Sequence, residues 1–100
     1  MIIYNVTVNI EDDVHDAWLK WMQEVHVPDV LGTGMFLENR ILKVLVEEET
    51  GGTTYAIQYT CESMARFREY EEKFAPALRA DAEKHFGGRF VAFRTLLETV

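Results

Sequence analysis

Residues 18–36 read WLKWMQEVHVPDVLGTGMF. Their pattern changes from a helical repeat to a proline and two glycines, and this change is the starting point for assigning the elements on either side. Apolar side chains recur there at three- and four-residue spacing, and the same stripe reaches back to Val14, which predicts one amphipathic helix. Val27 precedes Pro28, so we expect it to leave helical geometry and Pro28 to begin a further helical turn. Gly32 and Gly34 should end that turn.

The residues before this helix predict a β-strand. Apolar side chains occupy every second position from 2 to 10, a period typical of strands: Ile2, Tyr4, Val6, Val8 and Ile10. The acidic residues 11–13 then supply an N-cap and favourable charge for the helix.

The residues after the glycines predict a β-hairpin. A strand is expected from about Phe36 to Glu48 and another from Thr53 to Cys61. Gly51–Gly52 between them is a hairpin turn signal. The acidic run 47–49 is interpreted as a solvated hairpin mouth.

The C-terminal part predicts a second helix and a last strand. Ser63 can cap a helix whose apolar repeat runs to Phe86, and Pro76 should kink it or split it in two. Gly87–Gly88 should stop the helix, and Arg89–Glu98 alternates as a strand does.

This order of elements is βαββαβ, the ferredoxin-like plan, within a single domain of residues 1–100. The predicted class is therefore α+β. Right-handed crossovers place both helices on one face of a four-stranded antiparallel sheet. We expect the most apolar strand faces to lie under the helices, namely Tyr4, Val6, Val8, Leu42, Val44, Val46, Tyr55, Ile57, Tyr59, Val91 and Phe93.

By parity, the opposite face would mix polar and apolar side chains: Ile3, Asn5, Thr7, Ile41, Lys43, Leu45, Ala56, Gln58, Thr60, Phe90, Ala92, Arg94 and Leu96. An antiparallel sheet can leave one face to water. This face is rich in large apolar residues, however, and such patches usually mark an interface. We therefore expect a second copy of the chain to cover it, which would make a homodimer with a barrel between two sheets.

Composition restricts the classes of function. The net charge of −7 and a sequence pI near 4.8 disfavour nucleic-acid binding, which depends on lysines and arginines. No apolar run approaches the roughly 20 residues of a membrane span, and the N-terminus has no basic region of a secretion signal. Cys61 is the only cysteine, so no internal disulfide can form and a cytoplasmic protein is expected.

Several segments also carry a resemblance to a known family. MIIYNVTVNI at the start, WLKWM followed by EVHVPDVLGTG, then VLVEEE and FVAFRT near the end are the matching stretches. On these the whole chain resembles a family of short bacterial proteins described only as a domain of unknown function, within the dimeric α/β-barrel superfamily. The resemblance implies the fold and a homodimer. The superfamily includes cofactor-independent, antibiotic-biosynthesis-type monooxygenases, but the family implies no activity.

His26 is the best single candidate for chemistry. Imidazole titrates near neutral pH and can move protons, so His26 would be a general base or a substrate anchor at the rim of the barrel. The structural alternative is a residue at the end of the helix that hydrogen-bonds nearby carbonyls. Both tryptophans cannot occupy the centre of one narrow stripe, so we expect Trp18 in the core and Trp21 at the edge near His26, with packing as its alternative role.

A second constellation comes from the strands: Asn5, Thr7, Lys43, Gln58 and Arg94. Cations inside a partly closed barrel need partners, because unpaired buried charge is costly. Glutamates across the dimer could supply them. Alternatively, these residues line a pocket for a small polar or acidic ligand, with Arg94 holding a carboxylate bidentately.

No cofactor or metal site is predicted. The three histidines are far apart without a paired ligand, and no phosphate-binding glycine loop or nucleophile elbow is present. The resulting hypothesis is an uncharacterised homodimeric binding or structural module with a small intersubunit pocket. The alternatives are a cofactor-independent enzyme, monooxygenase- or isomerase-like, acting on a small polar or aromatic compound through His26, and an adaptor that uses a sheet edge or the acidic surface.

Overall fold

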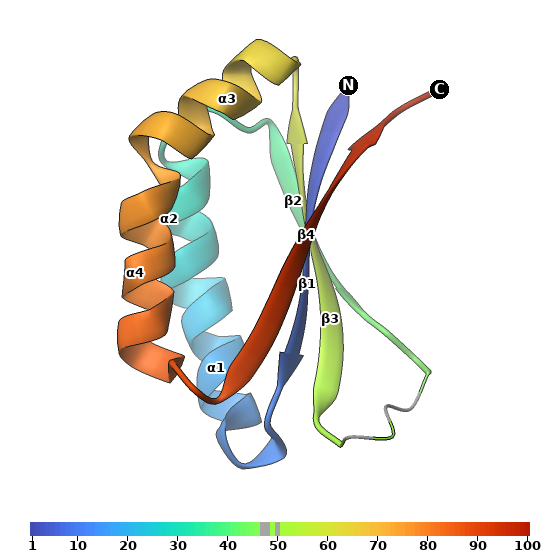
Figure 1. Cartoon of the computed structure of the whole chain (residues 1–100), viewed down its shortest axis with the longest axis vertical. Coiled ribbons are helices and arrows are strands. Elements are labelled where there is room, and N and C mark those ends of the chain that lie inside the picture. Colours follow the sequence, from blue (N-terminus) through green and yellow to red (C-terminus); the bar gives the residue numbers. More distant parts are fainter. Residues whose placement is uncertain (47–48, 50) are drawn as a thin grey trace.

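The helices of the molecule cover one face of a four-stranded antiparallel sheet, as the βαββαβ prediction required (Figure 1). The structure is a computed structural model that describes residues 1–46, 49 and 51–100. The strand order is β2-β3-β1-β4. The elements are β1 (Ile2–Ile10), the 3₁₀ turn η1 (Asp12–Val14), α1 (His15–Trp21), the π-helical turn η2 (Met22–His26), α2 (Val27–Leu31), β2 (Glu38–Lys43), β3 (Thr53–Cys61), α3 (Met64–Lys73), α4 (Ala75–Phe86) and β4 (Phe90–Glu98).

The first helical segment runs without a break from Asp12 to Leu31 and widens into a π turn in the middle. The expectation that Val27 leaves helical geometry is wrong, since its φ of −61° and ψ of −45° are helical. A proline ring in a regular α-helix would meet the carbonyl four residues earlier. The π turn directly precedes α2, whose second residue is Pro28, and we attribute the uninterrupted helix to this wider spacing.

The hairpin is shorter than predicted on one side. β3 has the predicted bounds, but β2 covers only Glu38–Lys43. Gly51 and Gly52 have φ of 80° and 75°, in the region that favours glycine. A Cβ at Gly52 would also lie 2.6 Å from Oδ1 of Asn9. Residues 47 and 48 of the acidic run lie outside the described residues.

The C-terminal helices follow the predicted boundaries closely. The hydroxyl of Ser63 accepts a hydrogen bond from the backbone N–H of Arg66 at 3.2 Å, which caps α3. The helix divides at Phe74, two residues before Pro76, as the proline predicted. Cys61 is completely buried, consistent with a small core residue.

The register shows that two strands, β2 and β4, turn toward the helices the face opposite to the one predicted. Arg94 pairs with Val6, and Lys43 pairs with Tyr55, so both lie on the face that the helices cover. Ile41, Phe90, Ala92 and Leu96 change face with them. The β1 and β3 residues predicted to lie beneath the helices do so, but those of β2 and β4 point outward instead, with Leu42 at 41%, Val91 at 70% and Phe93 at 64% exposure.

The reason for the error is that both faces of β4 are apolar, so alternation alone does not choose between them. The structure shows contacts that hold the start of β4 against the end of β1. The backbone N–H of Glu11 donates to the carbonyl of Arg89 at 3.0 Å. The Arg89 guanidinium also pairs with the carboxylates of Glu11 and Asp13. Phe90 is thereby placed opposite Ile10, with the rest of β4 in step.

Candidate functional site

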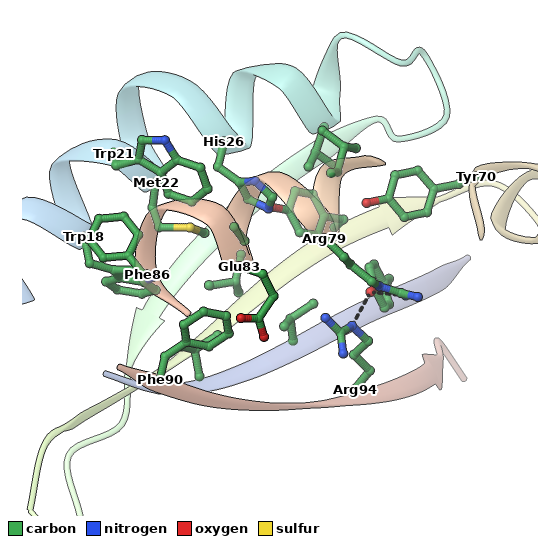
Figure 2. A pocket seen from close by; sticks show the side chains of 18 residues that line it. Trp18, Trp21, Met22, His26, Tyr70, Arg79, Glu83, Phe86, Phe90 and Arg94 are labelled. Atoms are coloured by element: carbon green, nitrogen blue, oxygen red, sulfur yellow. Dashed lines mark hydrogen bonds between the residues drawn. The ribbon is translucent and has the colours of Figure 1, made fainter. Parts of the chain in front are cut away.

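A cavity of about 270 Å³ lies between the helices and the covered face of the sheet (Figure 2). Its walls include buried or half-buried apolar side chains from four elements: Trp18, Trp21, Met22, Phe86 and Phe90. Polar side chains also line it, namely Tyr4, His26, Tyr59, Tyr70, Arg79, Glu83 and Arg94. The volume lies just below the roughly 300–1,000 Å³ that drug-sized ligands occupy, so it suits a small compound.

The π turn brings Trp21 and His26 together at this cavity. Residues five apart on a regular α-helix point about 140° away from each other. In a π turn the hydrogen bonds run between residues five apart, which brings such residues toward one side. The rings of Trp21 and His26 are stacked, with centroids 5.0 Å apart and planes 25° apart. Trp18 is 3% exposed, so the two tryptophans take the core and edge positions that the sequence suggested.

His26 is buried in a way that favours its neutral form. Burial lowers the pKa of its imidazole, and the carboxylates of Asp29 and Asp81 only partly oppose that effect. Its Nδ1 atom is buried and has no hydrogen-bond partner among the described residues. His26 is the last residue of the π turn and lies inside the helical segment, not at its end, where the structural alternative had placed it. A neutral imidazole at a cavity wall can accept or donate one hydrogen bond and can take up a proton.

Two further side chains of the cavity also have a buried polar atom without a hydrogen-bond partner among the described residues. Nε1 of Trp21 and the hydroxyl of Tyr59 are buried and lack a partner in the part of the chain that the structure describes. Leaving such a group unsatisfied costs about 1–3 kcal/mol. Burial raises the pKa of Tyr59, so its hydroxyl keeps its proton. Unpaired groups of this kind call for an explanation, and all three belong to residues of one cavity.

The other end of the cavity is cationic. Figure 2 shows the side chains of Arg79 and Arg94 lying near each other, and both guanidinium groups bond to the hydroxyl of Tyr4. That oxygen accepts from Nη2 of Arg79 at 3.1 Å and from Nε of Arg94 at 3.0 Å. Arg79 also donates to a Glu71 carboxylate oxygen at 2.6 Å. Arg94 has no carboxylate partner among the residues described here, so its terminal nitrogens can bind an anion.

The remaining predicted residues lie elsewhere. Asn5, Thr7 and Gln58 share the uncovered face of the sheet, as expected. They bond to one another, with Asn5 Nδ2 3.0 Å from the Thr7 hydroxyl and Gln58 Nε2 3.3 Å from Asn5 Oδ1. Lys43 is exposed at the end of β2 on the covered face and does not line the cavity. The five-residue constellation is therefore not one site, since the sheet separates Arg94 from the three amide and hydroxyl residues.

Five of the polar cavity residues were absent from the sequence-based candidates: Tyr4, Tyr59, Tyr70, Arg79 and Glu83. A signal for two of them existed. Arg79, Ala82, Glu83 and Phe86 have the i, i+3, i+4, i+7 spacing of one helix face, so the charged residues share the face that meets the cavity. The three tyrosines give no such signal, because aromatic residues in strands or on the apolar face of a helix are usually core.

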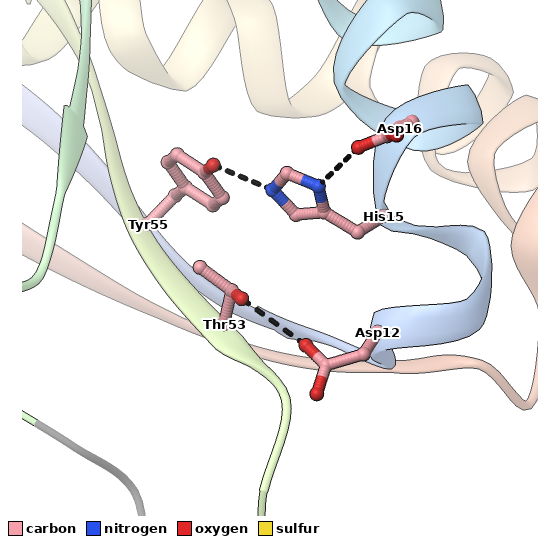
Figure 3. Close-up of polar contacts among 5 residues, drawn as sticks. All are labelled: Asp12, His15, Asp16, Thr53 and Tyr55. Carbon is pink, nitrogen blue, oxygen red and sulfur yellow. Dashed lines mark hydrogen bonds and ion pairs between the residues drawn. The ribbon is translucent and has the colours of Figure 1, made fainter.

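A different histidine cluster lies away from the cavity, where α1 meets β3 (Figure 3). Nδ1 of His15 is 2.8 Å from Oδ1 of Asp16, and Nε2 is 2.7 Å from the hydroxyl of Tyr55. Burial, followed by the charge of Asp16, raises the pKa of Tyr55. Nearby, the hydroxyl of Thr53 donates to Asp12 at 3.2 Å. Both ring nitrogens of His15 have hydrogen-bond partners, so this cluster has no free imidazole nitrogen for a ligand.

Within residues 1–46, 49 and 51–100, no three His, Cys, Asp or Glu side chains gather in a way that could hold a metal ion. In that same part of the chain, no helix combines the length and the apolar character needed to cross a bilayer.

Comparisons with known proteins agree on the fold. The family model described as Domain of unknown function (DUF4286) matches residues 1–100. A search of curated proteins gives no significant match. Among solved structures, HapK from Hahella chejuensis is similar with a TM-score of 0.74 and 14% identity, covering 100% of this chain and 93% of that one.

Two further structures are similar over the whole of this chain. An ethyl tert-butyl ether (EthD) family protein from Bacillus halodurans has a TM-score of 0.68 at 13% identity, with 100% of that chain covered. A dimeric ferredoxin-like protein from an uncultured marine organism has a TM-score of 0.65 at 16% identity, with 93% of that chain covered. At these identities the likeness shows the ferredoxin-like fold.

Proposed function

The chain belongs to the family described as Domain of unknown function (DUF4286), and we propose that it binds a small, largely apolar compound carrying an anionic group in the cavity between sheet and helices. One observation carries the proposal. Among the described residues, the buried side-chain polar atoms without partners are on Trp21, His26 and Tyr59, and all three residues line this one cavity. A bound compound that hydrogen-bonds to one of these atoms would remove part of that penalty.

The chemistry of the walls defines the compound. Aromatic side chains on α1, α4 and β4 would hold an apolar or aromatic body. The terminal nitrogens of Arg94, which have no acidic partner in the described chain, would hold a carboxylate. The compound would be small, because a cavity of about 270 Å³ lies just below the range of pockets that bind drug-sized ligands.

A matched pair of probes tests this function. We expect calorimetric titration to show 2-naphthoate binding at least ten times more tightly than the neutral 2-naphthamide, which is about 1.4 kcal/mol. The Arg94→Gln variant should remove that preference. The control, Arg68→Gln, changes the same charge at an exposed position of α3 outside the cavity and should keep it.

The proposal fails if neither probe binds at millimolar concentration. Equal binding of both probes would overturn the anionic part. An Arg68→Gln variant that loses the preference as fully as Arg94→Gln would show a general charge effect and not a site.

We also propose that the protein is a homodimer in which a second copy packs on the uncovered sheet face. Val91, Phe93, Leu97 and Leu42 are exposed there, and the similar marine protein is described as dimeric. Asn5, Thr7 and Gln58 would then line the space between the two sheets, where the predicted intersubunit pocket would lie. A cytoplasmic location, expected from the single cysteine, belongs to the same proposal.

Light scattering at micromolar concentration checks the assembly. The expected mass is twice the 11.6 kDa of the chain, and Phe93→Asp should reduce it to one chain because a charge enters the apolar contact. A wild-type mass near 11.6 kDa would exclude this dimer.

A cofactor-independent enzyme is the second candidate, and one observation favours it. His26 lines the cavity, has a lowered pKa and has an unpartnered ring nitrogen, which suits a general base. The enzyme would bind its substrate in the same cavity, with Arg94 holding the anionic end.

A further inference from the structure

We propose that the compound in this cavity is a zwitterion, an α-amino acid with an aromatic or large aliphatic side chain. Its carboxylate would bind Arg94 and its ammonium group would bind Glu83. The inference rests on the proposed function and deepens it, because it names the class of ligand and assigns a second charged subsite.

The first observation is a carboxylate without a cation. Figure 2 shows the Glu83 side chain extending from α4 toward β4, with Phe90 on one side and Arg94 on the other. Glu83 makes no ion pair or side-chain hydrogen bond with any residue that the structure describes. Arg79 is four residues earlier on the same helix, a spacing that favours pairing, yet it pairs with Glu71 and Tyr4.

The second observation is the unfavourable position of this carboxylate. Glu83 lies in the last turn of α4, where the helix macrodipole disfavours negative charge. The two basic residues of that turn do not pair with it, because His85 pairs with Asp81 and Lys84 makes no ion pair among the described residues. A Cβ at Gly87 would lie 2.5 Å from Oε2 of Glu83, so the glycine leaves the room that this carboxylate occupies. A ligand ammonium would supply the missing charge.

The third observation is that the two unpaired charges of the cavity do not pair with each other. Glu83 and Arg94 both line it, and no ion pair joins them. A ligand with one charge would therefore leave the other without a partner. An α-amino acid carries both, on adjacent groups, and its side chain extends away from them.

The cavity has charged residues at its mouth and apolar residues in its interior, which fits such a molecule. Glu83 and Arg94 are exposed at its mouth, while Trp18 and Met22 are buried in its wall. Charged groups that bind near the mouth keep part of their hydration, so the desolvation cost of the ion pairs is limited. The apolar side chain of the ligand would enter the interior, where Trp18, Met22 and Phe86 would surround it.

Three related probes separate the two charges. L-Phenylalanine carries both, 3-phenylpropionate lacks the ammonium group, and phenethylamine lacks the carboxylate. In calorimetric titrations we expect L-phenylalanine to bind at least tenfold more tightly than either analogue. Glu83→Gln should reduce L-phenylalanine binding to the level of 3-phenylpropionate while leaving the latter unchanged. Arg94→Gln should reduce it to the level of phenethylamine.

Controls keep the result interpretable. Glu72→Gln makes the same change at an exposed position of α3 outside the cavity and should bind all three probes as the wild type does. Retained binding of 3-phenylpropionate by Glu83→Gln shows that the variant folds and keeps its cavity.

Each contrary outcome has a distinct meaning. If 3-phenylpropionate binds as tightly as L-phenylalanine, or if naphthoate binds and L-phenylalanine does not, the zwitterion is overturned and the anionic apolar ligand stands. If naphthoate also fails to bind, the proposed function falls as well.

Discussion

His15 and His26 lie on the same helical segment, yet their surroundings are opposite. Both ring nitrogens of His15 have partners, in Asp16 and Tyr55 (Figure 3). Nδ1 of His26, at the wall of the cavity shown in Figure 2, is buried and has no partner among the described residues. The same cavity is lined by two more residues with such atoms, Trp21 and Tyr59. A polar cluster that satisfies itself has no hydrogen bond to offer a ligand, whereas an unsatisfied one beside a cavity does.

The same contrast separates the two faces of the sheet. Asn5, Thr7 and Gln58 on the uncovered face bond to one another. The polar side chains on the covered face are only partly paired, since Arg94 bonds to Tyr4 but to no acid within the described chain. This difference favours the covered face for the proposed binding site.

The largest expected effect comes from removing one hydroxyl from each region. Tyr55→Phe takes a partner from Nε2 of His15, so the free energy of unfolding should fall by about 1–2 kcal/mol. Tyr59→Phe removes a buried hydroxyl that has no described partner, so the same quantity should stay unchanged or rise. Urea denaturation of the two variants, both in β3, measures the difference.

Equal losses of stability in the two variants would contradict the difference between the hydrogen-bonded His15 cluster and the unpaired polar groups of the cavity. A large loss for Tyr59→Phe alone would mean that its hydroxyl has a partner in solution, such as an ordered water molecule.

A smaller effect should appear in the pH dependence of stability. An unfolded histidine titrates near pH 6.5, and burial lowers the pKa of His26 in the fold. Below about pH 6.5 the unfolded chain therefore takes up this proton before the folded chain does. The contribution of His26 to stability should accordingly decrease as the pH falls from about 6.5 through its folded pKa.

His26→Gln should thus lose less stability than the wild type between pH 7.5 and pH 5, as measured by urea denaturation at each pH. Gln23→Ala, at an exposed position of the same π turn, should keep the wild-type slope. An unchanged slope in His26→Gln would show that the imidazole is more hydrated than the structure indicates.

Much of the fold could be predicted because its signals are local. Alternation from Ile2 to Ile10, the Ser63 cap and the break before Pro76 each depend on a few neighbouring residues, and each was found as predicted. Helical geometry at Val27 was not predicted, since the π turn before it depends on more of the chain than the Val-Pro pair.

Only some residues of the candidate site could be predicted from the sequence. His26 and Trp21 were chosen for their chemistry, and the structure places both at the cavity. Arg94 was chosen as well but was assigned to the wrong face, together with Lys43. A shift of one residue moves a strand's side chains to the other face, and a strand that is apolar on both sides does not reveal its phase.

The amino-acid sequence by itself determined the order of the elements and the class of fold, because hydrophobic periods, caps and glycine turns act over short distances. Only the tertiary structure decided which face of β4 meets the helices, through the contacts of Arg89 with the end of β1. That choice brings Arg94 to the same cavity as Glu83, Tyr59 and His26. Such a meeting depends on pairing between distant segments, which no local pattern specifies.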